Sequence, residues 1–120
     1  MKNWIPAFLL FLILFTSGKA FGQKYDIDSV ETALEQSTGV NKIPSYYILT
    51  DYYIYHSPDK AIKLTNELLI LAESYDSTSI IEYCYQLLGE AYFYQEKYEH
   101  SLQYFKKYLS TQIEKDNQSG

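Results

Sequence analysis

Apolar side chains recur at steps of three and four residues along the second half of this 120-residue sequence. The residues that follow these steps are Ile81, Tyr85, Leu88 and Tyr92, and then Tyr98, Leu102, Phe105 and Leu109. Side chains spaced in this way lie on one face of an α-helix. Tyrosine-rich runs such as residues 45–55 favour strands, but no Asn-Gly or Asp-Gly turn closes a hairpin of strands. The sequence therefore predicts an all-α fold of antiparallel helices with short connections.

Capping residues predict where these helices begin and end. A short first helix is expected between an N-cap at Asp26 or Asp28 and Gly39 beyond its end. The next two helices are expected to divide at Ser57, which can cap a helix, and Pro58, which fits the first helical position. The remaining turns are expected at residues 75–79 and 95–97.

Residues 1–22 have the layout of a secretory signal peptide. Lys2 precedes the apolar run Trp4–Phe15, and Ala20 and Gly22 supply the small residues of a cleavage site. The run is shorter than the roughly 20 residues that a membrane-spanning helix needs. We therefore expect an exported protein, periplasmic or extracytoplasmic, with an uncleaved signal anchor as the alternative.

The charge of the chain bears on its partners. The formal net charge is −5, and the sequence contains no arginine. Nucleic acids bind proteins through clustered lysine and arginine, so we expect no nucleic-acid partner. Contact with a membrane is expected only through an uncleaved signal or through a segment beyond this sequence.

Few side chains have the chemistry of a catalytic or metal site. Cys84 is the single cysteine and lies among apolar residues of an expected helix, where a buried small side chain is its expected role. Glu96 and His100 share a helical face, but structural zinc takes four ligands. His56 lies in an expected turn. We therefore expect no catalytic residue, no metal and no cofactor, and an enzyme that uses Cys84 or His100 is the alternative class.

One pattern of residues runs across the last two expected helices. Its members are Tyr85, Leu88, Gly89 and Tyr92, and then Tyr98, Ser101, Phe105 and Tyr108. This pattern resembles the tetratricopeptide repeat (TPR), W-x2-L-G-x2-Y followed by a small residue and an aromatic one. Tyr85 replaces the tryptophan of the motif and Ser101 its alanine. Ile113 replaces its proline, so the second helix is expected to run on.

The glycine of this pattern needs a physical reason, because glycine costs about 1 kcal/mol relative to alanine in a helix interior. We expect Gly89 to face Ser101 on the next helix. Two small residues let the backbones approach, so that the large residues around them interlock. Gly89 is therefore expected to be structural.

A weaker copy of the pattern lies upstream. Ala61 aligns with Ser101, and Tyr52 aligns with Tyr92, but Leu49 stands in place of the glycine. HEAT-type repeats share this period of about 40 residues and are the alternative. The Leu-Gly and Tyr positions favour the TPR.

The expected signal peptide, the short first helix and the segment SPDKAI at residues 57–62 are together similar to the exported TPR regions of bacterial membrane sensor histidine kinases and regulators. The resemblance implies helical hairpins stacked as a short α-solenoid. The expected ranges are 1–22 for the signal peptide, 23–41 for a short helix and linker, 42–81 for a first repeat with its linking turn, 82–115 for a second repeat, and 116–120 for the start of a further turn.

The resemblance also implies that one face of each first helix lines a concave groove. The residues on that face are Tyr46, Thr50, Tyr53 and Ile54, and then Tyr83, Gln86, Glu90, Phe93 and Tyr94. Such a groove is aromatic and slightly acidic, and it suits a protein or peptide segment. The alternative is that these tyrosines pack against neighbouring repeats.

The last expected helix carries an apolar face that no later residue of the sequence covers. Leu102, Phe105 and Leu109 form it. Residues 115–120 resemble the turn at residues 74–79, so we expect either a fragment of a longer protein or pairing with a second copy.

The expected function is non-catalytic binding of a protein or peptide, in the extracytoplasmic input region of a bacterial signalling protein. The alternative is a free-standing structural or oligomerising TPR module without a dedicated ligand.

Overall fold

The computed structural model of the protein describes residues 24–119, which form five α-helices and one short 3-10 helix. In chain order they are α2 (Ile27–Gln36), η2 (Gly39–Lys42), α3 (Ile43–His56), α4 (Pro58–Ser74), α5 (Thr78–Tyr94) and α6 (Tyr98–Ser119). These residues contain no strand, so the predicted all-α fold is confirmed. The expected signal peptide, residues 1–22, lies outside the described residues.

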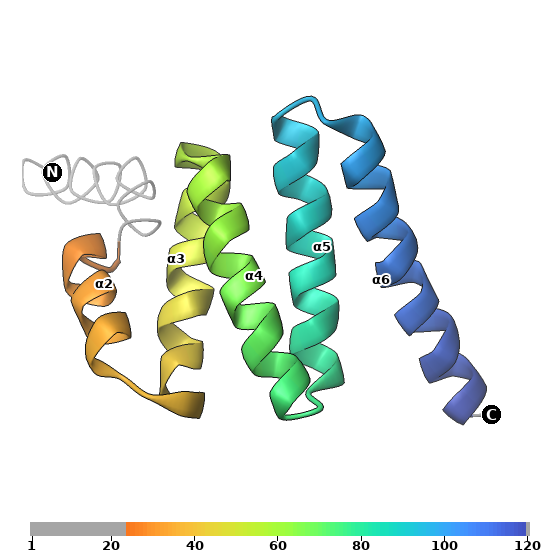
Figure 1. The fold of residues 1–120 in the computed structure, drawn as a ribbon, viewed down its shortest axis with the longest axis horizontal. Coiled ribbons are helices and arrows are strands. Elements are labelled where there is room, and N and C mark those ends of the chain that lie inside the picture. Colours follow the sequence, from red (N-terminus) through yellow and green to blue (C-terminus); the bar gives the residue numbers. More distant parts are fainter. Residues whose placement is uncertain (1–23, 120) are drawn as a thin grey trace, which may run out of the picture.

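Each helix packs against its neighbours in the sequence, and the helices form a row in chain order (Figure 1). The turns that join α3, α4, α5 and α6 are short, so successive helices run in opposite directions. It follows that α3 and α5 run in the same direction, and these two helices also contact one another. The candidate site lies on the side of the row where α3 meets α5.

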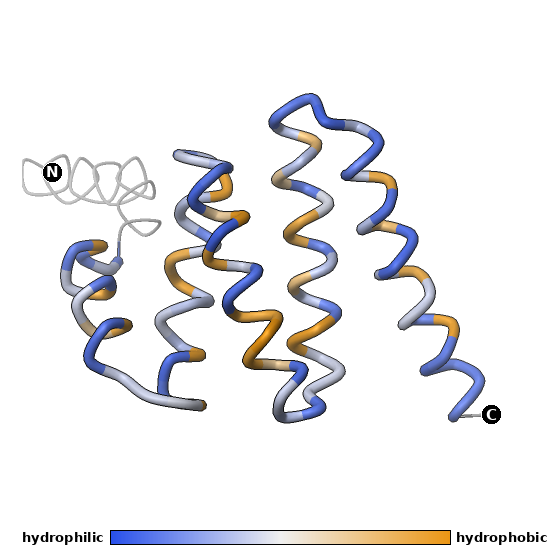
Figure 2. Tube along the Cα trace, in the orientation of Figure 1, coloured by the Kyte–Doolittle hydropathy of each residue, from blue (hydrophilic) through white to orange (hydrophobic). Residues whose placement is uncertain are grey.

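The core lies between α3, α4 and α5. Its largest fully buried side chains include Leu49, Ile54, Leu68 and Leu88. Burial of one such side chain contributes about 1.5–3 kcal/mol to folding. In contrast, α6 is mostly hydrophilic, with apolar residues at intervals along it (Figure 2). No helix within residues 24–119 is both long enough and apolar enough to cross a membrane.

The capping residues predicted the division between α3 and α4. Ser57 is the N-cap of α4, and Pro58 is its first residue. Proline suits this position because its ring holds φ near the helical value. The predicted turn at residues 95–97 is also confirmed, whereas α5 begins at Thr78, inside the turn expected at residues 75–79.

The turns after α4 and α5 have the same hydrogen-bond pattern. In the first turn the Ser77 N–H donates to the Ala72 carbonyl oxygen at 3.0 Å, and in the second the Lys97 N–H makes the equivalent bond at 2.9 Å. Asp76 and Glu96 occupy the left-handed position of each turn, with φ of 52° and 62°. This is the Schellman motif, in which that position is usually glycine. Neither turn is marked by glycine in the sequence, although both reverse the chain in the same way.

The end of α6 corrects one prediction. Residues 116–119 are helical, where the sequence analysis placed the start of a turn. Ile113 stands where the motif has proline, so no residue blocks the helix there. In addition, Lys115 Nζ lies 2.8 Å from Glu82 Oε2 and ties the last turns of α6 to α5.

Candidate functional site

The residues predicted to line a groove fall into two groups in the structure. Those from α3 are buried, and they are Tyr46, Thr50, Tyr53 and Ile54. The Tyr46 hydroxyl donates to Glu67 Oε2 of α4 at 3.2 Å, and Thr50 Oγ1 donates to the Tyr46 carbonyl oxygen at 2.7 Å. These four side chains are therefore part of the packing of α3 and line no open surface.

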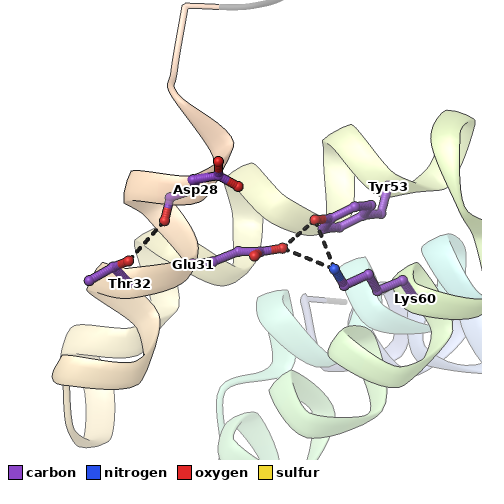
Figure 3. Close-up of polar contacts among 5 residues, drawn as sticks. All are labelled: Asp28, Glu31, Thr32, Tyr53 and Lys60. Carbon is purple, nitrogen blue, oxygen red and sulfur yellow. Dashed lines mark hydrogen bonds and ion pairs between the residues drawn. The ribbon is translucent and has the colours of Figure 1, made fainter.

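Tyr53 belongs to a polar network that joins α2 to α3 and α4 (Figure 3). Its hydroxyl donates to Glu31 of α2, and Lys60 Nζ lies 3.1 Å from both Glu31 Oε1 and the Tyr53 hydroxyl oxygen. The hydrogen bond from Tyr53, followed by that from Lys60, lowers the pKa of Glu31. Asp26, one of the two predicted N-caps, is the N-cap of α2. The network gives Tyr53 a structural role, because it holds α2 on the side of α3.

The residues predicted from α5 reach the surface. Gln86 is exposed and Glu90 is half-buried. Phe93 and Tyr94 are 54% and 48% exposed. Tyr83 is half-buried at the other end of the helix. This group remains a candidate for contact with a ligand.

Three residues of α3 that the sequence analysis missed share the surface with this group. They are Tyr47, Asp51 and Tyr55, which are four residues apart and so lie along one side of the helix. The Tyr47 and Tyr83 ring centroids are 4.5 Å apart, and those of Tyr55 and Tyr94 are 5.9 Å apart. We call the combined surface the tyrosine strip, and its residues are Tyr47, Asp51, Tyr55, Tyr83, Gln86, Glu90 and Tyr94.

The missed residues follow the buried ones by one position. Tyr47 comes directly after Tyr46, and Asp51 directly after Thr50. One residue corresponds to a rotation of about 100° around the helix, which is enough to move a side chain from the core to the surface. The four-residue spacing of Tyr47, Asp51 and Tyr55 is the signal in the sequence that could have identified them.

The tyrosine strip is electrically negative. Neither Asp51 nor Glu90 has an ion-pair partner within residues 24–119. The pKa of Tyr55 is raised, first by Tyr94 and then by Glu90 and Asp51. Burial raises the pKa of Tyr83 to about 12, whereas its hydrogen bond with Thr50 lowers it and Asp51 makes a smaller contribution that raises it. Asp51 thus lies close enough to both phenol groups, and Glu90 to that of Tyr55, to disfavour further negative charge there.

A hollow lies at each end of the tyrosine strip. The first has a volume of about 380 Å³, and its lining comprises Lys24, Tyr25, Ile27, Tyr47, Ile48, Asp51, Tyr52 and Tyr83. The second has a volume of about 250 Å³, and its lining comprises Glu90, Phe93, Tyr94 and Phe105. The strip is therefore a shallow surface with an aromatic depression at both ends.

The motif positions on α5 and α6 divide between core and surface. Leu88, Gly89 and Ser101 are buried, Tyr85, Tyr92 and Tyr108 are half-buried, and Tyr98 and Phe105 are exposed. Ser101 does face Gly89, as the sequence predicted. Tyr104 of α6 packs beside Tyr85 and Tyr92, with ring centroids 6.3 Å and 5.7 Å apart. These rings stabilise the α5–α6 hairpin and lie outside the strip.

The side chains considered for reactive chemistry, Cys84, His56 and His100, all pack against other side chains. Cys84 is buried as predicted, and burial raises its pKa to about 12. The His56 ring stacks on Tyr52 with centroids 4.0 Å apart, and the His100 ring lies 5.1 Å from that of Tyr92. Within residues 24–119, no three His, Cys, Asp or Glu residues are grouped closely enough to hold a metal ion.

An apolar face of α6 is open to solvent. Its residues are Tyr98, Leu102, Phe105, Leu109 and Ile113, and we call them the α6 stripe. Their exposed fractions are 57%, 55%, 37%, 57% and 52% in that order. The predicted exposure of Leu102, Phe105 and Leu109 is thus confirmed.

The tyrosine strip and the α6 stripe are thus two exposed surfaces of the described helices. Comparison of the chain with protein-family models, with curated proteins and with solved structures found no match.

Proposed function

We propose that this protein is a non-catalytic scaffold that binds a protein or peptide segment along the tyrosine strip. The observation that carries the proposal is the pairing of rings across two helices, Tyr47 with Tyr83 and Tyr55 with Tyr94. Tyr55 is 68% exposed, so its ring contributes little to the core. Aromatic side chains held in place by neighbouring rings are typical anchors of binding surfaces.

We also propose that α3–α4 and α5–α6 are two TPR-like hairpins stacked side by side. Their alternating directions support this, and so does the contact between the small residues Gly89 and Ser101 where α5 and α6 cross. Ala61, which aligns with Ser101 in the sequence, is fully buried in α4. In this proposal the protein is exported and forms the extracytoplasmic input region of a bacterial signalling protein. The layout of residues 1–22 and the family resemblance support that context.

Selection of peptides from a random display library with the purified protein tests the binding proposal. A selected peptide should bind in fluorescence polarisation and lose most of its affinity when Tyr55→Ala and Tyr94→Ala are combined. These side chains are 68% and 48% exposed, so helicity measured by circular dichroism should not change. The matched control is Ile70→Ala on α4, which is 70% exposed and outside the strip. Binding that survives the double substitution, or that falls as far in the control, contradicts the proposal.

A second candidate function is self-association, which the α6 stripe favours. A contiguous apolar face of this kind on one helix is typical of an interaction surface. Analytical ultracentrifugation over a range of protein concentrations should then show a dimer, and Leu102→Ser combined with Leu109→Ser should abolish it. A protein that remains monomeric at the highest concentrations rules out this function.

A further inference from the structure

We infer that the ligand of the tyrosine strip is a basic peptide in an extended conformation, with lysine or arginine at alternate positions. The inference rests on the function proposed above and names the chemistry of the partner. Three features of the strip support it: the order of its groups, its unpaired charges and its length.

The order of groups places carboxylates between pairs of rings. Asp51 lies one helical turn after Tyr47 and one turn before Tyr55 on α3. Glu90 lies one turn before Tyr94 on α5. A cation at the centre of the strip therefore meets the carboxylates, and cations at its ends meet the paired phenol rings. Tyrosine faces attract lysine and arginine through the charge distribution of the ring.

The charge of the strip is complementary to a cation. No lysine or histidine within residues 24–119 forms an ion pair with Asp51 or Glu90. Lys24 is the basic residue in the lining of the larger hollow, and its Nζ lies 5.6 Å from the centroid of the Tyr25 ring. The chain as a whole has a net charge of −5. An acidic segment would meet like charge on this surface, whereas a basic one is attracted to it.

The length of the strip along α3 matches three alternate residues of an extended peptide. At a rise of about 1.5 Å per residue, Tyr47 and Tyr55 are about 12 Å apart along α3, with Asp51 midway. Alternate side chains of an extended peptide point to the same side at intervals of about 6.6 Å, so three of them span about 13 Å. The central one then reaches the carboxylates while the outer two reach the ring pairs.

Three synthetic peptides of equal length test the inference. They carry arginine, serine or glutamate at three alternate positions, with glycine and serine elsewhere, and their binding to the full chain is measured by fluorescence polarisation. The arginine peptide should bind about tenfold more tightly than the other two. Its affinity should fall as salt is added, because salt screens exposed charges. Equal affinity for the arginine and glutamate peptides overturns the inference.

Substitutions that change only charge give the second test. Asp51→Asn with Glu90→Gln should weaken the arginine peptide about tenfold. Glu99→Gln with Glu114→Gln removes the same charge from exposed positions of α6, outside the strip, and should leave affinity unchanged. Similar losses in both variants would mean that net charge alone attracts the peptide, which overturns the inference.

Charge reversal separates this inference from the function proposed above. The combination of Asp51→Lys and Glu90→Lys should make the glutamate peptide the tighter ligand, and a retained preference for arginine overturns the inference. Circular dichroism of each variant tests whether it is folded. Each should be folded, because Asp51 is exposed and Glu90 is half-buried. If a neutral library peptide binds through Tyr55 and Tyr94 while the arginine peptide does not bind, the proposed function holds and this inference fails. If no peptide binds the strip, both fail.

Discussion

Ser101 Oγ donates a 2.7 Å hydrogen bond to the Gly89 carbonyl oxygen where α6 crosses α5. The Phe105 ring, one turn further along α6, lies against Gly89. A Cβ atom added to Gly89 would lie 2.7, 2.8 and 2.9 Å from three atoms of that ring, closer than real Cβ contacts come. Gly89 thus leaves the space that the Phe105 ring occupies, and a Cβ atom there would require that ring to move.

Gly89→Ala should therefore stabilise the protein by less than the gain of about 1 kcal/mol that alanine gives in a helix interior. The reason is that the Phe105 ring, which is 37% exposed, must move to make room for the Cβ atom. In a Phe105→Ala background the obstacle is gone, so the same substitution should stabilise by about 1 kcal/mol. Urea unfolding of the unsubstituted protein, the two single variants and the double variant measures both effects. Gly89→Leu has a larger side chain and should lower the thermal midpoint by several degrees.

A second prediction concerns the left-handed residues of the two turns. Glu96 has a φ of 62° and Asp76 a φ of 52°, which are unfavourable for residues with a Cβ atom. Glu96→Gly should raise the free energy of unfolding by roughly 0.5–1 kcal/mol, and Asp76→Gly should do the same. Glu96→Ala is the control, because alanine loses the carboxylate but keeps the Cβ. If alanine stabilises as much as glycine, the gain comes from removal of charge and the backbone explanation is wrong.

Periodicity and capping residues were sufficient to predict that these segments are helices, although not where α5 begins or where α6 ends. The apolar steps along α5 and α6 mark one face of each helix, and Ser57 with Pro58 marks the break between α3 and α4. The contact between Gly89 and Ser101 was also predictable, because only small residues allow two helix backbones so close together.

The orientation of α3 was not predictable in the same way. Its neighbouring residues are chemically alike, with Tyr46 beside Tyr47 and Ile54 beside Tyr55. When apolar and aromatic residues surround a helix, periodicity does not show which of them face the core. Contacts distant in sequence decide the matter, such as the bond from the Tyr53 hydroxyl to Glu31 of α2. The tyrosine strip depends on this orientation and so was only half predicted.

The end of α6 was missed for a related reason. Residues 116–119 are polar and include asparagine and serine, which favour turns. The ion pair that joins Lys115 to Glu82 links residues far apart in the sequence. A local reading of the sequence cannot reveal such a pair.

A third prediction follows from this ion pair. The Glu82 side chain is 10% exposed, and its Oε1 has no hydrogen-bond partner within the described residues, so Lys115 is the cation that balances it. Lys115→Met should lower the free energy of unfolding by roughly 1–2 kcal/mol, because it leaves a nearly buried carboxylate without a countercharge. In a Glu82→Gln background the same substitution should have little effect. Guanidinium unfolding measures this cycle, and additive losses would show that the two residues act separately.

The last prediction concerns alkaline pH. Burial raises the pKa of Cys84 to about 12 and that of Tyr83 to about 12, above the usual values of about 8.5 and 10. Between the unfolded and the folded pKa the native state holds a proton that the unfolded state has lost. The contribution to stability is therefore complete below about pH 8.5 and is lost as the pH rises toward 12.

The thermal midpoint should accordingly fall as the pH rises above about 8.5, first through the thiol of Cys84 and then through the phenols of Tyr83 and Tyr46, whose pKa is also raised to about 12. Cys84→Ala should reduce the slope of that fall between about pH 8.5 and 10, where the thiol is the group that titrates in the unfolded chain. Leu87→Ala is the control, because Leu87 is buried in the same helix and cannot ionise. That control should lower the midpoint by a similar amount at every pH, since it removes packing alone. Circular dichroism melts at each pH measure the slopes, and a slope in Cys84→Ala equal to that of the unsubstituted protein would exclude Cys84 as the source of the pH dependence.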